Sequence, residues 1–210
     1  MGRNMEAIFT RHSTRSFEPG YIIPLETQMA ILEAGTNAPS PKNRQPWRFI
    51  ILDQKESIQK SADVLEERVN VLKAERIGQN LDISDLNMAL LTADIIRAAS
   101  LLVFICYDRD EANEHGEKMG WSVAAQAFEV ADILSIGACV ENMLLMAESL
   151  GIDSLWICDV LYAEHEFEEH FMSINPILSA VAFGKEHKRR TMRLGVDRIA
   201  RWITKADDKA

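Results

Sequence analysis

Four short apolar segments separated by helical periodicity limit the possible folds of this chain more than any other feature. The segments are Trp47–Leu52, Leu101–Cys106, Ser154–Cys158 and Ile177–Phe183, the last closed by Gly184. Each is too short for a typical helix and rich in β-branched or aromatic residues, so each is predicted to be a buried strand. Buried strands need helices on their sheet, which indicates an α+β or α/β layered fold. Periodicity alone does not distinguish these two classes.

Helical spacing predicts the elements between the strands. The expected helices cover residues 4–9 after an Asn4 cap, 24–34 with Pro24 in the first turn and Gly35 as the stop, 58–72, 84–99, 121–150 and 164–171. Residues 75–82 are predicted to form a loop, and the charged residues 108–118 a solvated segment. The helix over 121–150 is apolar on more than one face and has small residues in its middle, so it is a candidate for the centre of a dimer.

Composition and charge exclude several classes of partner. The chain has 210 residues with 47% hydrophobic content, which favours a single domain over residues 1–210. Its net charge of -9 argues against binding to nucleic acid or to anionic membrane surfaces. We find no apolar run of roughly 18 residues and no signal-peptide pattern, and three cysteines without C-x-x-C spacing are expected to be reduced thiols. These features predict a cytoplasmic protein.

A first polar cluster lies just after the first predicted helix. Arg11, Ser13 and Arg15 alternate along five residues, with His12 between them. Arginine forks, a hydroxyl and free backbone N–H groups are the donors that a phosphate needs. Taken alone, the cluster fits a solvated helix end better than a ligand site.

A second polar cluster directly precedes the first strand. The segment Pro39–Pro46 combines three prolines with the side chains of Ser40, Asn43 and Gln45. Prolines stiffen the backbone and can hold polar groups at fixed positions. Taken alone, this segment fits a turn that merely joins a helix to a strand better than it fits a ligand site.

Together, the two clusters match a known pattern. Arg-x-Ser-x-Arg-x-Phe at 11–17, followed by Ala-Pro-Ser-x-x-Asn-x-Gln-Pro-Trp-x-Phe at 38–49, resembles the nitroreductase family of FMN-dependent NAD(P)H oxidoreductases. The resemblance continues through Trp121, the following long helix, and residues 151–157, which look like that family's Gly-Leu-Gly-Ser-x-Trp-Ile stretch. It ends at Gly184 and Arg193 and is weakest over residues 55–99.

The resemblance implies a fold, an assembly and a cofactor. The expected fold is α+β, a helix-flanked mixed β-sheet in a homodimer that exchanges a C-terminal strand, for which residues 196–203 are suitable. FMN would be the cofactor and NADH or NADPH the reductant. The residues that match the family's cofactor-binding positions are Arg11, His12, Ser13, Arg15, Ile157, Cys158 and Arg193 from one subunit, and Pro39, Ser40, Pro41 and Asn43 from the other.

The implied roles of these residues differ. Arg11, Ser13 and Arg193 would contact the phosphate or ribityl chain, and Arg15 would lie at the pyrimidine edge, where a cation stabilises the charge of the reduced ring. The backbone near Ile157 and Cys158 would face the flavin N5. No side chain is predicted to be catalytic, and no histidine has partners at metal-binding spacing.

Cys158 departs from the family, which commonly has a glycine after Trp-Ile. The cysteine either narrows the space above N5 or is a small buried residue, and we favour the second interpretation because free cysteine usually behaves as a small hydrophobe. The acceptor is expected to be a nitroaromatic, a quinone or a related small electrophile. A specialised flavoenzyme that does not use nicotinamide, and a non-catalytic flavin-binding or sensing module, stay open as alternatives.

Overall fold

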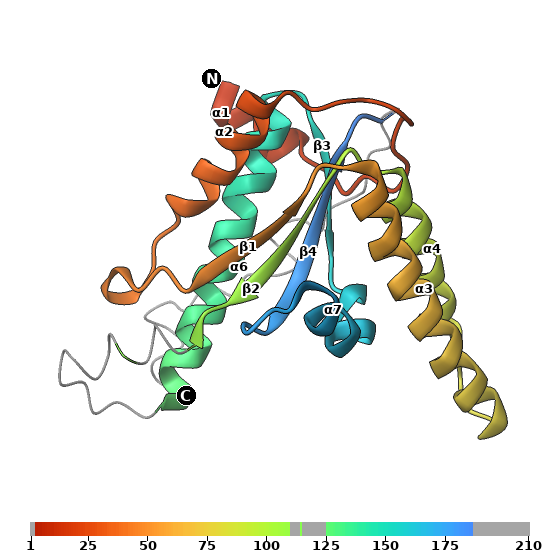
Figure 1. Cartoon of the computed structure of the whole chain (residues 1–210). Helices are drawn as coiled ribbons and strands as arrows, with labels where there is room; N and C mark the ends of the chain where they lie inside the picture. The colour runs from red at the N-terminus through yellow and green to blue at the C-terminus, as the bar shows by residue number, and fades with distance from the viewer. Residues whose placement is uncertain (1–2, 110–113, 115–124, 187–210) are drawn as a thin grey trace, which may run out of the picture.

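The four predicted strands form one sheet with the order β1-β2-β4-β3 (Figure 1). A computed structural model describes residues 3–109, 114 and 125–186. The strands are β1 (Trp47–Leu52), β2 (Leu101–Tyr107), β3 (Asp153–Ile157) and β4 (Ile177–Gly184). Each predicted strand is confirmed to within one residue at either end. The three ladders among the described residues are antiparallel, and a parallel pairing occurs there as a single bridge between Ser13 and Ser154.

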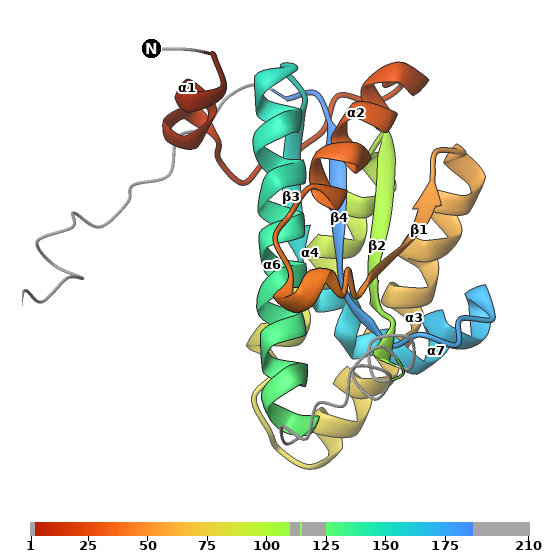
Figure 2. The same ribbon diagram turned by 90° about the vertical axis from the view of Figure 1, so that its left-hand side faces the viewer.

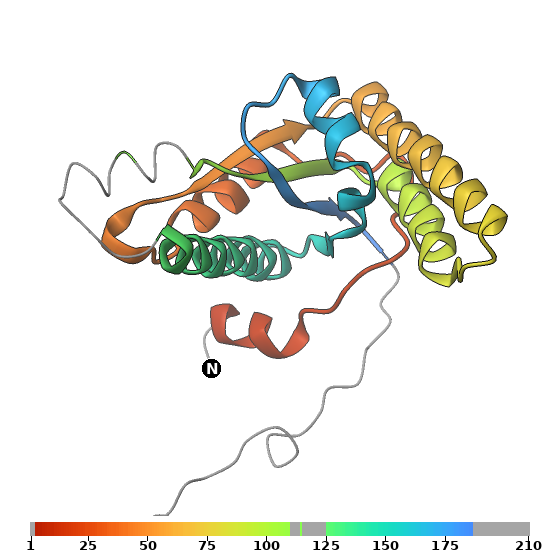
Figure 3. The ribbon, with the colours of Figure 1, turned by 90° about the horizontal axis from the view of Figure 1, so that it is seen from below.

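Helices cover both faces of this sheet (Figure 2). They are α1 (Arg3–Thr10), α2 (Leu25–Thr36), α3 (Lys55–Gly78), α4 (Ser84–Ala98), α6 (Ala125–Ser149) and α7 (Glu164–Phe171), with short 3-10 turns η1 (Pro41–Asn43) and η2 (Asp159–Ala163). Seen from below, α2 and α6 lie on one side of the strands, α3 and α4 lie on the other, and α1 packs outside α6 (Figure 3). The predicted α+β class with a helix-flanked sheet is confirmed.

Strand β2 divides its side chains between the two faces. All seven of its residues are buried. Leu102, Phe104 and Cys106 point into the core beneath α3 and α4. Leu101, Val103, Ile105 and Tyr107 point into the core beneath α2 and α6. A central strand covered on both faces is apolar throughout, which is why the sequence pattern predicted it without alternation.

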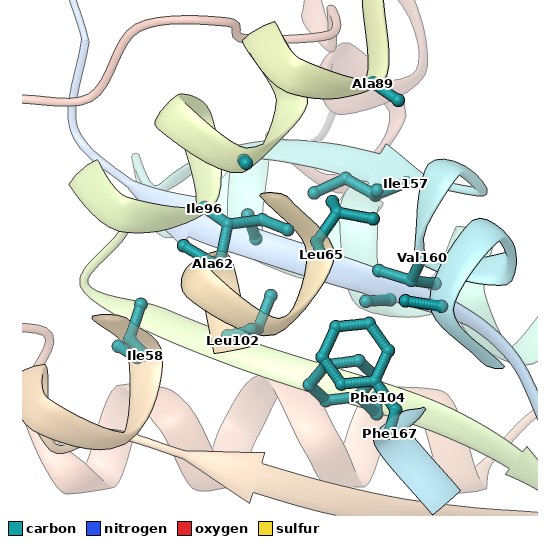
Figure 4. Close-up of a cluster of buried hydrophobic side chains, with 14 of the residues drawn as sticks. Ile58, Ala62, Leu65, Ala89, Ile96, Leu102, Phe104, Ile157, Val160 and Phe167 are labelled. Atoms are coloured by element: carbon teal, nitrogen blue, oxygen red, sulfur yellow. The ribbon is translucent and has the colours of Figure 1, made fainter. Parts of the chain in front are cut away.

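The core beneath α3 and α4 is aliphatic and aromatic (Figure 4). Ile58, Ala62, Leu65 and Val69 recur at helical spacing on α3, and all of them are buried as the periodicity predicted. The ring centroid of Phe104 lies 4.8 Å from that of Phe167 on α7. The apolar side chains that recur at helical spacing on α3 therefore pack against this face of the sheet and form its core.

The core beneath α2 and α6 contains a close helix contact that corrects the sequence analysis. Gly35 was predicted to stop its helix, but it lies inside α2, and the helix continues to Thr36. A Cβ atom at Gly35 would lie 2.7 Å from Cγ of Met143 on α6. The helical spacing of Leu25, Met29 and Leu32 predicts that these three residues share one apolar face, and this prediction is wrong in part, since Leu25 and Met29 are 69% and 47% exposed. The absence of a side chain at Gly35 allows α2 and α6 to approach closely. The face of α2 that is buried in this contact carries Ile31, Leu32 and Gly35.

Other helix boundaries also differ from the predictions, and α3 begins at Lys55, three residues before the predicted start at 58. Helix α3 extends to Gly78, so the predicted loop over 75–82 is confined to its second half. Helix α2 begins at Leu25, and Pro24 is its N-cap residue. The one-residue difference at α2 is of the size expected for helix ends. Helix α3 instead extends six residues beyond the predicted end at 72, so that prediction of the helix end is wrong.

Helix α6 modifies the prediction about apolar runs. By length and composition, its segment Phe128–Ser149 is apolar enough to cross a membrane, although four acidic residues interrupt it: Glu129, Asp132, Glu141 and Glu148. Cys139, Val140 and Met143 are fully buried against the sheet and α2. In this fold one face of the segment is therefore part of the core, while Leu134 on another face is 70% exposed.

Several predicted features lie outside the described residues. They include most of the charged segment 108–118, the first residues of the helix predicted over 121–150, Arg193, and the apolar piece 196–203 that was expected to exchange between subunits.

Candidate functional site

The segment Arg11–Arg15 runs along the free edge of β3. The backbone N–H of Thr14 donates to the carbonyl of Ser154 at 2.9 Å, and Ser13 forms the parallel bridge to the same residue. Side chains alternate along this extended stretch, because successive residues of an extended chain point to opposite sides. His12 and Thr14 are buried, whereas Ser13 is half-buried and Arg15 is exposed. The alternation therefore puts Arg11, Ser13 and Arg15 on one side.

His12 is turned toward the protein interior. Its Nδ1 lies 3.3 Å from the carbonyl oxygen of Thr10, and its Nε2 lies 3.4 Å from the hydroxyl of Thr14. The imidazole thus bonds to its own segment, and the structure does not bring its side chain to the side that carries Arg11, Ser13 and Arg15.

The two arginines have different environments. Arg11 Nε lies 3.6 Å from Oε1 of Glu141 on α6, with the Arg11 side chain 16% exposed. Arg15 donates from Nη1 to the Ser13 carbonyl at 3.4 Å and is exposed. A guanidinium has five N–H donors, so both side chains keep donors for a ligand beside these contacts.

Arg15 opens onto a pocket of about 660 Å³ between β3 and α4. The volume lies within the roughly 300–1,000 Å³ range of small-molecule and cofactor sites. Its walls are mainly apolar, and they include Phe17, Met88, Leu91, Ile95, Leu155, Trp156, Ile157 and Cys158. Three of the predicted site residues, Arg15, Ile157 and Cys158, therefore line one pocket.

Cys158 is exposed on the pocket wall, which contradicts the favoured interpretation of a buried core residue. Because β3 ends at Ile157, Cys158 lies beyond the strand, where its side chain faces the pocket and not the core. Partial desolvation by neighbouring groups raises the pKa of the thiol, and the negative charge of Asp159 raises it further. The thiol is consequently protonated at neutral pH and is a poor nucleophile. The structure favours the other reading, in which the side chain narrows the pocket.

A polar bridge that sequence reasoning missed spans this pocket. The hydroxyl of Thr92 on α4 lies 2.5 Å from Oδ2 of Asp159, and both residues line the cavity. The two are 67 residues apart, so no local motif connects them. A polar residue on the buried face of α4 was the available signal.

The second polar cluster lies elsewhere in the chain. The turn η1, which contains Pro41 and Asn43, contacts α6. Helix α4, which lines the pocket together with β3, lies on the opposite side of the sheet from α6 (Figures 1 and 2). Within one chain, the structure does not bring Pro39, Ser40, Pro41 or Asn43 to Arg15. Arg193 lies outside the described residues.

Arg44 and Asp132 form the other polar feature that sequence reasoning missed. Arg44 Nε and Nη2 donate to the two carboxylate oxygens of Asp132 at 2.9 and 2.8 Å. The side chains are 1% and 0% exposed. A carboxylate in the middle of an apolar helix was the signal for a buried partner, but nothing in the sequence identified that partner.

The arrangement is suited to a flat apolar ligand with an anionic tail. The apolar pocket would take the flat part, Arg15 supplies a cation at its rim, and Arg11 and Ser13 extend the row of donors along β3. Among the described residues, no group of three His, Cys, Asp or Glu side chains could hold a metal ion.

Comparison with known proteins agrees with this geometry. The model of the family described as "Nitroreductase family" matches residues 8–185. A Bacillus subtilis protein named "Putative NAD(P)H nitroreductase YdgI" is 27% identical over 209 residues, covering 94% of this chain and 96% of the relative.

Solved structures have the same fold. A BluB-like flavoprotein from Clostridium difficile 630 superposes with a TM-score of 0.74 at 21% identity, over 95% of this chain and 98% of that one. A Desulfovibrio desulfuricans protein, named a "putative nitroreductase" and solved in complex with FMN, has a TM-score of 0.71 at 21% identity, over 97% and 98% of the two chains. With the family model matching most of its length, this chain belongs to the nitroreductase family.

Proposed function

We propose that this protein is an FMN-dependent oxidoreductase that NADH or NADPH reduces and a small electrophile reoxidises. The observation that carries the proposal is the extended segment 11–15, which aligns Arg11, Ser13 and Arg15 on one side and leads directly into an apolar pocket. Membership of the nitroreductase family, a relative named as an NAD(P)H nitroreductase, and a structural neighbour solved with FMN support the same assignment.

The residues present fit FMN by size and chemistry. The pocket of about 660 Å³ is mainly apolar and suits a tricyclic ring, and Arg15 supplies a cation at its rim. Arg11 and Ser13 would hold the phosphate or ribityl chain, with His12 contributing through its backbone and Arg193 from the C-terminal segment. When bound, FMN supplies the hydride-accepting centre, and the protein orients it and tunes its charge.

Three predicted site residues that line the pocket would then have defined roles. Arg15 would stabilise negative charge at the pyrimidine edge of the ring. The backbone near Ile157 and Cys158 would lie against the ring, and the protonated Cys158 thiol would limit the room above it. The chain forms one domain over residues 1–210 in this proposal, and it needs no side chain as a catalytic acid, base or nucleophile.

The active form in this proposal is a homodimer. The Pro39–Asn43 loop lies across the sheet from the pocket of its own chain, so it would serve the pocket of a second copy. Large apolar side chains are exposed on the outer side of α1 and α6, including Phe9 at 74% and Leu134 at 70%. Exposed apolar patches of this kind mark interfaces in soluble proteins. A molar mass of one chain in light scattering would contradict the dimer.

Cofactor binding and reduction test the function directly. Purified protein is expected to be yellow or to become yellow when FMN is added, and NADH or NADPH should bleach that colour in the absence of oxygen. Protein that cannot be loaded with FMN would contradict the proposal.

The same experiment separates the remaining alternatives. Flavin that binds but is not reduced by either nicotinamide would favour a specialised flavoenzyme. Flavin that is reduced but not reoxidised by a panel of nitroaromatics and quinones would favour a binding or sensing module.

A further inference from the structure

A buried network joins the loop before β1 to the start of α6, and the pocket does not use it. Beside its two bonds from Arg44, Asp132 accepts a third from the hydroxyl of Tyr107 at 3.1 Å. The Arg44 guanidinium also lies 5.0 Å from the ring centroid of Phe128. Burial, and then Asp132, raise the pKa of Tyr107 to about 12, so the phenol keeps the proton it donates.

Stability alone is a weak explanation for this network. Removing two charges from water is unfavourable, and replacing a buried ion pair by apolar residues of similar volume is often neutral or stabilising. Arg44 and Asp132 are 1% and 0% exposed, so the unfavourable desolvation applies to both in full. A role in fixing one particular conformation explains the pair better.

The loop that holds Arg44 has a strained backbone. Lys42, Asn43 and Gln45 have φ angles of 55°, 58° and 46°. Residues with a Cβ atom rarely adopt this left-handed conformation, and they keep it only where surrounding contacts determine it. The Ser40 hydroxyl accepts from the N–H of Gln45 at 3.0 Å, and the Ser40 carbonyl accepts from the N–H of Asn43 at 3.0 Å.

Arg44 is the point at which this loop is attached to the core. It is buried, whereas Lys42, Asn43 and Gln45 around it are exposed. Its planar fork fixes both direction and register, because two parallel bonds to one carboxylate allow a single orientation. The exposed residues on either side are thereby held outward.

We infer that Arg44 and Asp132 are positioning residues that hold the Pro39–Pro46 loop in the strained conformation in which Ser40 and Asn43 meet FMN at the second subunit. This inference rests on the proposed function. A loop ordered before the cofactor arrives loses less conformational freedom on binding, so the network raises affinity without touching the cofactor.

FMN affinity of the full-length protein tests this inference. The variant R44L/D132L/Y107F replaces the network by apolar side chains, and R44K keeps the charge but removes the fork. The matched control R109L/E129L removes an exposed ion pair, 2.8 Å long, near the same end of α6. Flavin-free protein is titrated with FMN by fluorescence quenching, and its melting temperature is measured in parallel.

We expect the triple variant to melt near the wild type and to bind FMN about tenfold more weakly or worse, a change of roughly 1.4 kcal/mol. R44K should be weakened in the same direction, and the control should stay within about twofold of the wild type, a change below roughly 0.5 kcal/mol. At saturating FMN, the visible circular dichroism of the bound flavin should change in both network variants and not in the control. A purely structural pair would leave that spectrum unchanged.

The outcomes separate this inference from the proposed function. Wild-type protein that binds no FMN contradicts the proposed function itself. Wild-type protein that binds FMN, beside a triple variant that binds it equally well with the same spectrum, overturns this inference alone. If the triple variant does not fold, R44K decides: unchanged affinity and spectrum then overturn the inference.

Discussion

Both faces of the sheet are buried beneath helices, but they are held together in different ways. On the α3 and α4 face, apolar side chains fill the core, and the charges lie at the surface, where Arg97 meets three carboxylates. On the α2 and α6 face, an ion pair is buried, and a glycine lets two helices approach closely. Away from the pocket between β3 and α4, the first face can be changed with consequences for stability only. The second face connects stability to the shape of a loop that we assign to the cofactor site.

Asp132→Ala should have the largest effect on stability. It leaves the Arg44 charge buried without a partner and removes the acceptor of Tyr107. Breaking a buried pair in this way typically costs about 3–5 kcal/mol. Urea unfolding of the flavin-free protein measures the loss, with Glu129→Ala on the same helix as control. A loss below about 1 kcal/mol would mean that water reaches the pair and that the two faces do not differ in this respect.

This network also shows where prediction from sequence ends. Strands β1, β2 and β4 were predicted because a buried strand is recognisable from its own few residues. The partners Arg44 and Asp132 are 88 residues apart, and no local pattern relates them. The Gly35 prediction was wrong for the same reason. The role of this glycine is set by the close approach of α6, which is distant in the sequence.

For the candidate site, the sequence predicted which residues belong to it but not how their side chains are oriented. The motif gave the residues of segment 11–15, and the structure adds that alternation turns His12 inward. It also shows that Cys158 belongs to a pocket wall and that Thr92 and Asp159, which line the same pocket, are hydrogen-bonded to each other. Those facts depend on where α4 lies relative to β3, and no local sequence pattern specifies that position.

Leu65→Ala tests the other face with a somewhat smaller expected effect. Leu65 is fully buried in the core beneath α3 and α4. Truncation of a buried leucine leaves a cavity and costs about 2–5 kcal/mol. Because Leu65 does not line the pocket assigned to the cofactor, FMN affinity of the folded variant should equal that of the wild type. A variant that unfolds at wild-type urea concentrations but binds FMN weakly would contradict the separation of the two faces.

Gly35→Ala should destabilise the α2 and α6 face more modestly. The new Cβ would lie 2.7 Å from Cγ of Met143 and 3.1 Å from Sγ of Cys139, so the methionine has to shift. Overpacking of this kind costs about 1–3 kcal/mol, partly offset by a gain of up to ~1 kcal/mol in helix propensity. The matched control is Gly78→Ala, where a Cβ meets nothing within 4 Å. Thermal melting should move down for the first variant and stay level or rise for the second.

Arg97→Met should have the smallest effect, although Arg97 has more ionic partners than Arg44. Its Nη atoms lie 3.0, 2.6 and 2.7 Å from carboxylates of Asp63, Glu66 and Asp94, and the hydrogen bonds to Asp63 and Glu66 raise its pKa. However, its side chain is 31% exposed, so water screens each contact, and exposed pairs contribute about 0–1 kcal/mol. The methionine keeps most of the apolar stem, and the three carboxylates regain hydration. The small loss of stability in Arg97→Met should decrease further in 1 M salt, where the Debye screening length is about 3 Å. The loss of stability in Asp132→Ala should persist there, because the buried pair is screened much less. Equal salt dependence of the two variants would show that burial, on which the comparison of the faces depends, does not distinguish them.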